Sequence, residues 1–225
     1  NTLYISFHQD GRTLYPGTGF PEEAGSPGAW GTNINLPLLP GTGDEGLHRL
    51  YDGLISHILE DFKPELIINS AGQDNHFSDP LASMAVTAQG YARLADKLQA
   101  DIAVLEGGYS VESALPYVNT GIILAMAGMD YSKVLEPDIS ELRKQDPRCN
   151  KRVDQLIEQV GNLYFNREST KKELLQKCNG VWQRKKHIYY DEEGIREQQL
   201  ETVRYCSICD GYFTIQTAAE DTRFG

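Results

Sequence analysis

The chain has 225 residues, a formal charge of -11 from 32 acidic and 21 basic side chains, and a mean hydropathy of -0.44. This length suits one α/β domain with an appendage. The negative charge argues against direct binding of nucleic acid, and no apolar run approaches the roughly 20 residues of a membrane span. The four cysteines are few for this length, which favours a reducing cytoplasm over a disulfide scaffold.

Strands and helices alternate along the first part of the chain. Apolar runs and helical spacing predict strands at 3–7, 33–36, 64–69 and 101–105, and helices at 44–61, 83–99 and 112–127. We expect Asp44 and Ser83 to cap two of these helices, and the Gly- and Pro-rich loop at 8–31 is long enough to be functional. This order is typical of βαβ units, so it predicts a parallel sheet covered by helices.

The character of the chain changes after Met129. Apolar residues at helical spacing predict one amphipathic helix with Val153, Leu156, Ile157, Val160 and Leu163 on its buried face. From Glu168 onward the sequence is polar and charged, with "YCSICDGYFTI" (205–215) as its one compact-looking element. We therefore expect residues 1–166 to form the α/β part and residues 167–225 to form an appended tail with a CxxC element.

Two polar loops follow neighbouring predicted strands, "SAGQDNHFSDPLA" (70–82) and "EGGYS" (106–110). Ligands of parallel sheets bind at the carboxyl ends of strands, so Asp74 and Tyr109 are expected to face one pocket. Asp74 could bind a cation such as zinc, and the Tyr109 phenol could donate a hydrogen bond to a developing oxyanion. The alternative is an ordinary polar loop, in which Asp79 and Pro80 form a turn that leads into a helix.

Four segments, taken in order, resemble the histone deacetylase family. They are "ISFHQDGRTLYPGTGFPEEAG" (5–25), "INLPLLPGTGDEGL" (34–47), "PELIINSAGQDNHFSDPLA" (64–82) and "VLEGGYSVESAL" (104–115). The likeness is to the bacterial and archaeal branch, which includes acetoin-utilisation proteins and acetylpolyamine amidohydrolases. It implies an arginase- and deacetylase-like α/β fold, a parallel sheet with flanking helices, present as a partial domain over about residues 1–130.

The resemblance implies roles for individual residues. Asp74 matches an aspartate ligand of the catalytic zinc ion (Zn2+), and Tyr109 matches the catalytic tyrosine that polarises the acetyl carbonyl. His76 matches a "DxH" variant of the bacterial branch, and we expect it to support the metal ligand from behind. The other implied positions are the substrate tunnel at Tyr15, Leu81, Gly107 and Gly108, and a structural K+ or Na+ at Ser6 and Phe7.

The resemblance also predicts what these residues lack. The family mechanism uses a pair of adjacent histidines and an upstream metal loop that supplies an aspartate and a histidine. None of the 5 histidines in this chain belongs to either motif. We therefore expect the C-terminal half of a deacetylase domain, inactive alone, that a second chain or an N-terminal half completes.

Two functions stay open. The first is a zinc-dependent, cytoplasmic deacetylase that hydrolyses an acetylated amine, of the acetyl-lysine or acetylpolyamine type, to amine and acetate. The second is a non-catalytic, deacetylase-like subunit or scaffold. An arginase-like binuclear metal hydrolase is disfavoured because Tyr109 stands where a second metal would need a carboxylate. Cys206 and Cys209 are either half of a structural zinc site or incidental thiols.

Overall fold

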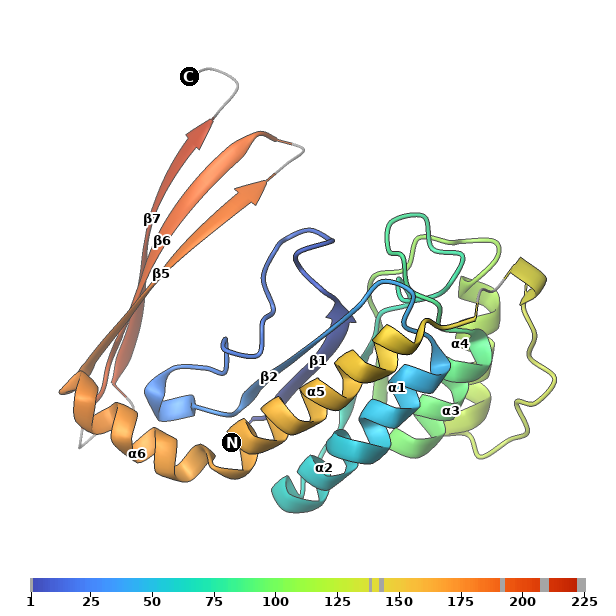
Figure 1. The fold of residues 1–225 in the computed structure, drawn as a ribbon, viewed down its shortest axis with the longest axis horizontal. Helices are drawn as coiled ribbons and strands as arrows, with labels where there is room; N and C mark the ends of the chain where they lie inside the picture. The colour runs from blue at the N-terminus through green and yellow to red at the C-terminus, as the bar shows by residue number, and fades with distance from the viewer. Residues whose placement is uncertain (1, 138, 142–143, 191–192, 207–210, 222–225) are drawn as a thin grey trace. The chain divides into compact units, whose positions relative to one another are not determined.

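The structure, a computed structural model, describes residues 2–137, 139–141, 144–190, 193–206 and 211–221 (Figure 1). Its strands are β1 (Tyr4–Gln9), β2 (Asn33–Leu38), β3 (Ile68–Ala71), β4 (Ile102–Leu105), β5 (Val181–Tyr190), β6 (Ile195–Arg204) and β7 (Tyr212–Asp221). Its α-helices are α1 (Asp44–Leu50), α2 (Ser56–Phe62), α3 (Ala88–Leu98), α4 (Leu115–Met126), α5 (Pro147–Phe165) and α6 (Arg167–Cys178). A π-helical turn at Tyr51–Ile55 joins α1 to α2, and short 3-10 turns lie at Pro27–Ala29 and Ile139–Glu141.

The chain forms two compact units, each assembled from separate stretches. One unit takes residues 1–6, 11–35 and 162–225, and the other takes residues 7–10 and 36–161. β1 and β2, which pair in a two-stranded sheet, contribute residues to both units. Compactness alone does not define a domain, so the expected division after residue 166 stays a prediction.

The parallel sheet expected from the alternating pattern is present as the pair β3 and β4. Ile68 lies opposite Ile102 and Ala71 lies opposite Leu105 in a parallel register. α3 connects the two strands and packs against α4, which follows β4 (Figure 1). β3 starts later than expected, at Ile68, and just before it the N–H of Ile67 donates to the Asp101 carboxylate at 2.8 Å. The carboxyl ends of both strands therefore reach the same edge.

The starts of two helices differ from the sequence prediction. Thr87, not Ser83, caps α3, because its hydroxyl accepts a hydrogen bond from the N–H of Gly90 at 3.0 Å. Asp44 is the first residue of α1 and not its cap. Its carboxylate instead accepts hydrogen bonds from the N–H and the hydroxyl of Thr87, at 2.8 and 2.7 Å. A side chain near one helix thus fixes the start of another, which a local pattern cannot reveal.

The core of the larger unit lies between β2, the α1–α2 segment and α5. The helix expected at 44–61 is present as α1, the π-helical turn and α2, and the expected amphipathic helix is α5. The buried apolar side chains here include Leu36, Leu38, Leu47, Leu50, Leu54, Ile58, Val153, Leu156 and Val160. Each contributes roughly 1.5–3 kcal/mol by leaving water. Gly53 lets α5 approach closely, since a Cβ atom there would lie 2.7 Å from Cδ1 of Ile157.

The tail contains more regular structure than its polar sequence suggests. β5, β6 and β7 form an antiparallel sheet in that order, preceded by α6. The expectation that 205–215 is the one compact element of the tail is therefore wrong. Along β5, exposed and half-buried residues alternate, whereas β7 is exposed along nearly its whole length. The strands were missed because charged and amide side chains occupy both sets of alternating positions in β5 and β6.

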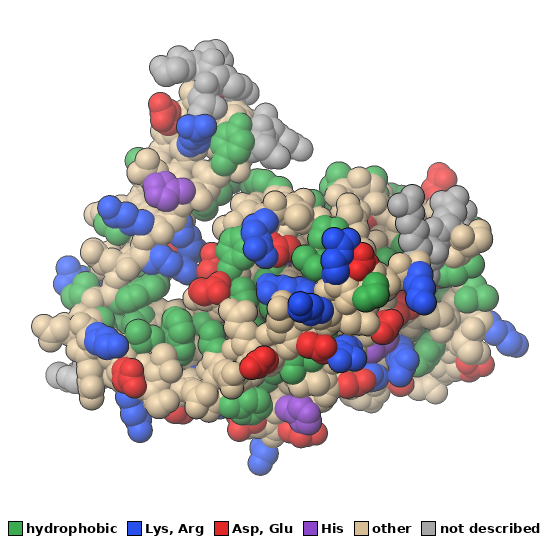
Figure 2. Space-filling view, in the orientation of Figure 1, with side chains coloured by type: hydrophobic (Ala, Val, Ile, Leu, Met, Phe, Trp, Pro, Cys, Tyr) green, Lys and Arg blue, Asp and Glu red, His purple; other side chains and the backbone are tan. Residues whose placement is uncertain are grey.

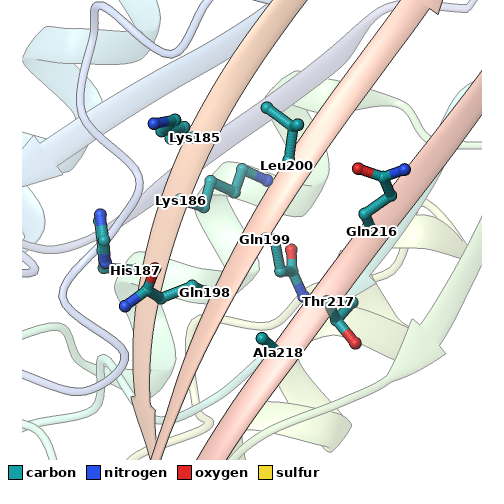
Figure 3. Close-up of a pocket in the computed structure, with 9 residues that line it drawn as sticks. All are labelled: Lys185, Lys186, His187, Gln198, Gln199, Leu200, Gln216, Thr217 and Ala218. Atoms are coloured by element: carbon teal, nitrogen blue, oxygen red, sulfur yellow. The ribbon is translucent and has the colours of Figure 1, made fainter.

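A pocket on this sheet is lined mainly by polar side chains from all three strands (Figure 3). Its lining residues are Lys185, Lys186, His187, Gln198, Gln199, Leu200, Gln216, Thr217 and Ala218. Elsewhere on the visible face, acidic and basic side chains are interspersed (Figure 2). No helix within the described ranges combines the length and the apolar character that a membrane crossing requires.

Candidate functional site

Two loops leave the carboxyl ends of β3 and β4 and lie beside each other. The first starts at Gly72 and leads towards α3, and the second starts at Glu106 and leads towards α4. The N–H of Gln73 donates a hydrogen bond to the carbonyl of Gly107 at 2.5 Å and so joins the two loops. Because the strands are parallel neighbours, the polar groups of both loops gather at one edge of the sheet.

Asp74 and Tyr109 approach the same point, beside the backbone of Gly107. A Cβ atom built on Gly107 would lie 3.2 Å from Oδ2 of Asp74 and 3.7 Å from the Tyr109 hydroxyl. Gly108 has a φ of +145°, and a Cβ atom there would lie 2.8 Å from Cβ of Gln73. Glycine at both positions therefore keeps the loop close to Gln73 and leaves the neighbourhood of the carboxylate and the phenol free of its own side chains.

The Asp74 carboxylate lies in an environment that disfavours its negative charge. Burial raises the pKa of Asp74 above its usual range, and the charges of Asp79 and Glu106 raise it further, while backbone N–H groups at Asp74 and Asn75 act in the opposite direction. Glu106 also accepts a hydrogen bond from the Ser70 hydroxyl at 2.6 Å. A bound cation would compensate this accumulation of negative charge.

Asp79 connects the two loops through its side chain. It is 8% exposed, and its Oδ1 accepts hydrogen bonds from the N–H groups of Leu81 and Ala82 at 2.9 and 3.1 Å. Its Oδ2 accepts a hydrogen bond from the N–H of Tyr109 at 2.9 Å. The carboxylate thus holds its own turn and the backbone of the tyrosine loop at the same time.

A row of polar groups, with His76 and Glu136 buried and Ser78 and Ser110 half-buried, lies beside the tyrosine loop. The Ser110 and Ser78 hydroxyl oxygens are 2.8 Å apart, and Ser78 Oγ is 2.9 Å from Nδ1 of His76. The other ring nitrogen of His76 lies 3.3 Å from Oε1 of Glu136, close enough for an ion pair but not aligned as a hydrogen bond. Burial would raise the pKa of Glu136, but the contact with His76 and backbone N–H groups, including that of Ala88, outweigh it and lower the pKa.

His76 is fully buried, and the contacts of its two ring nitrogens go to Ser78 and Glu136. The role expected for it behind the metal ligand stays a prediction. Its links run towards Ser110, the residue after Tyr109, and so towards the second of the two loops. This direction was not visible in the sequence.

The other residues expected in the substrate tunnel lie on exposed loops. Leu81, in the turn that Asp79 holds, is 58% exposed. Tyr15 is 52% exposed and belongs to the other compact unit, in the loop after β1. The tunnel roles of both residues stay predictions, as do those of Gly107 and Gly108.

The expected ion sites outside the two loops also stay predictions. Ser6 and Phe7 lie in the middle of β1 and are partly buried. Cys206 is exposed just after β6, whereas Cys209 lies outside the described residues. The structure therefore gives no test of a CxxC zinc site.

The site also contains residues that the sequence did not single out. Tyr91, on α3, is 5% exposed, and burial raises its pKa well above the usual range, with a further contribution from the charge of Asp74. Ser78, Ser110 and the buried Glu136 belong to the row of polar groups beside the tyrosine loop. Glu136 lies 60 positions from His76 in a segment with no clear periodicity, so no local signal could have identified it.

Asp74 alone does not make a zinc site. A catalytic zinc is held by three protein ligands. The carboxylate of Asp74 is a suitable donor, but within the parts of the chain that the structure describes, no three His, Cys, Asp or Glu side chains come together in a way that could hold a metal ion. These residues therefore fit only part of such a site.

Parallel strands whose carboxyl-terminal loops carry a carboxylate and a phenol define an α/β protein with a polar site at the carboxyl edge of its sheet. Comparison with known proteins identifies the family. Residues 1–125, more than half of the chain, match the histone deacetylase domain, and the chain belongs to the histone deacetylase family.

The relatives include archaeal and bacterial proteins, as the resemblance predicted, and also plant histone deacetylases. The chain is 52% identical over 157 residues to a "Probable deacetylase" of Archaeoglobus fulgidus, covering 64% of this chain and 43% of the relative. It is 35% identical over 153 residues to the acetoin utilization protein AcuC of Bacillus subtilis, with 64% and 40% covered. The chain thus spans less than half the length of these relatives.

A solved structure confirms the expected fold class. An acetylpolyamine aminohydrolase from Burkholderia pseudomallei is 31% identical in sequence to this chain. The two structures match with a TM-score of 0.52 over 56% of this chain and 38% of that one. The deacetylase-like α/β fold predicted from the sequence is therefore correct.

Proposed function

We propose that this chain is the C-terminal part of a zinc-dependent deacetylase that hydrolyses an acetylated amine to the amine and acetate. The observation that supports it most is the approach of Asp74 and Tyr109 to one point beside Gly107. The chain belongs to the histone deacetylase family, and this membership supports a deacetylase role for the two residues. The acyl substrate is of the acetyl-lysine or acetylpolyamine type.

The two side chains would perform different tasks. Asp74 would supply one carboxylate ligand to the metal, which when bound polarises a carbonyl group and makes water more acidic. The Tyr109 phenol would donate a hydrogen bond to the acetyl oxygen as negative charge develops there. A neutral phenol can donate this hydrogen bond, whereas a phenolate cannot. The remaining metal ligands and the histidine base would come from an N-terminal half or a second chain that completes the domain.

The exposed apolar side chains of β3 and β4 support a missing neighbour. Ile68, Ile102, Val104 and Leu105 are between 44% and 71% exposed. Parallel strands are normally covered on both faces. We infer that a further segment, on the same polypeptide or on a second one, covers these strands and supplies the histidines.

A second function has one observation in its favour. No set of side chains that could hold a metal was found in the described ranges, which suits a non-catalytic subunit of deacetylase-like fold. The two functions differ in what happens when the rest of the domain is present. A subunit of this kind would keep its partner but would not gain a metal ligand from Asp74.

The test uses the complete protein, which is this chain together with the segment that completes the domain. In that protein, Asp74→Ala should remove deacetylase activity on an acetylated lysine peptide and on an acetylpolyamine, and should lower the zinc content measured by mass spectrometry. Asp101→Asn is the matched control, because Asp101 is also an aspartate that accepts a backbone N–H beside this sheet. Retention of both zinc and activity by the Asp74 variant would exclude the proposed role.

A further inference from the structure

The backbone of Tyr109 is held by a side chain from the neighbouring loop. We propose that Asp79 is a positioning residue for Tyr109, acting through the hydrogen bond between its Oδ2 and the N–H of Tyr109. The inference rests on the proposed function, because it assigns to Asp79 the placement of the phenol for the reaction. Among the described residues, the hydrogen bonds of the Asp79 carboxylate go to the backbone N–H groups of Leu81, Ala82 and Tyr109.

The tyrosine loop needs such an anchor. Tyr109 follows two glycines, which have no side chains to pack and permit many backbone conformations. The Tyr109 side chain is itself 52% exposed, so packing does not hold it firmly. Restraint must therefore come from the backbone, and the Asp79 carboxylate supplies it from a site that is 8% exposed.

A second contact restrains the next residue. The Ser110 hydroxyl lies 2.8 Å from the Ser78 hydroxyl, which in turn lies 2.9 Å from the buried His76 ring. Ser78 and Asp79 are adjacent, and so are Tyr109 and Ser110. Two consecutive residues of one loop thus hold two consecutive residues of the other. The two contacts together fix the orientation of the tyrosine loop as well as its distance from the first loop.

The carboxylate is required by the number of donors around it. Asp79 accepts three backbone N–H groups with its two oxygens. An asparagine has one oxygen and an NH2 group, and that NH2 group would face an N–H donor on one side. Asp79→Asn therefore keeps the shape of the side chain but loses one of the two attachments. A displacement of about 1 Å at a catalytic group can cost about 100-fold in rate.

A double-mutant cycle in the complete protein tests the proposal. Asp79→Asn should lower kcat on an acetylated lysine peptide by about 10- to 100-fold with little change in KM. In a Tyr109→Phe background, Asp79→Asn should have almost no further effect, because the group that it positions is gone. Asp101→Asn should leave kcat unchanged in both backgrounds. An unchanged kcat in Asp79→Asn, or an equal loss in both backgrounds, would overturn the proposal.

Amide hydrogen exchange separates this inference from the proposed function. Asp79→Asn should speed exchange of the Tyr109 amide by about tenfold or more and leave the Ile67 amide unchanged. Asp101→Ala should do the reverse, since it removes the carboxylate that accepts the Ile67 N–H. This result does not depend on catalysis. An inactive wild-type protein would reject the deacetylase function, whereas an equally protected Tyr109 amide in Asp79→Asn would reject the role of Asp79.

Discussion

The loops after β3 and β4 and the β5–β6–β7 sheet both contain carboxylates shielded from solvent, but they stabilise them differently. In the loops, Asp79 is held by backbone N–H groups, which carry no net charge. In the sheet, Glu201 is 5% exposed and lies 2.6 Å from Arg184 and 2.8 Å from Lys186. The loops therefore leave their carboxylates without a nearby positive charge, whereas the sheet pairs Glu201 with two cations.

The pKa directions agree with this contrast. The pKa of Asp74 is raised by burial and by neighbouring carboxylates. For Glu201, burial acts to raise the pKa, but Lys186 and Arg184 outweigh it and the pKa is lowered. A region that gathers uncompensated acids is suited to binding a cation, and a region that pairs them is suited to holding strands in register.

The largest expected effect is a loss of kcat, and it concerns the loops after β3 and β4. In the complete protein, Tyr109→Phe should lower kcat by about 100- to 1000-fold, because one hydrogen-bond donor to the oxyanion is lost, while zinc content stays the same. Tyr190→Phe is the matched control in the sheet, where the Tyr190 hydroxyl donates to Glu197 at 2.8 Å. Steady-state kinetics on an acetylated peptide would measure both. Equal rates for wild type and Tyr109→Phe would remove this tyrosine from the mechanism.

A smaller effect concerns stability in acid. His48, on α1, is 7% exposed, and burial, with the charges of Lys97 and Arg93, lowers its pKa from 6.5 to about 4. The unfolded chain takes up this proton near pH 6.5, but the folded protein resists it. The contribution of neutral His48 to the free energy of unfolding is therefore fully present above pH 6.5. It falls as the pH is lowered towards 4, by about 3 kcal/mol in all.

Urea unfolding at about pH 7 and about pH 4.5 would measure this loss. In His48→Leu the difference between the two pH values should shrink by about 2 kcal/mol or more. The sheet offers an internal comparison, because the lowered pKa of Glu201 keeps its ion pairs intact until the pH falls below the ordinary glutamate value of 4.5. Fluorescence of Trp182, on β5, in a Trp30→Phe background would report the unfolding of this sheet. The same pH dependence in His48→Leu and wild type would contradict the assignment.

The sequence predicted the region of parallel strands better than the tail. Short apolar runs followed by polar loops identified β3, β4 and the edge from which both loops leave, and the rule for parallel sheets predicted that Asp74 and Tyr109 lie close together, as they do. The role of Asp79 was missed because its turn has an ordinary local explanation, whereas its decisive partner is 30 residues away. Glu136 was missed for the same reason. In the tail, strands such as "VWQRKKHIYY" carry charged and amide side chains at both sets of alternating positions, so apolar periodicity could not identify them.

The most direct test of the central claim is the position of the metal. Anomalous diffraction from crystals of the complete protein grown with zinc would locate the ion independently of activity. The account predicts zinc with an Asp74 carboxylate oxygen at about 2.0–2.2 Å, on the side of Gly107 where the Tyr109 hydroxyl lies. A fully occupied zinc bound elsewhere, with Asp74 contacting only protein atoms or water, would contradict it.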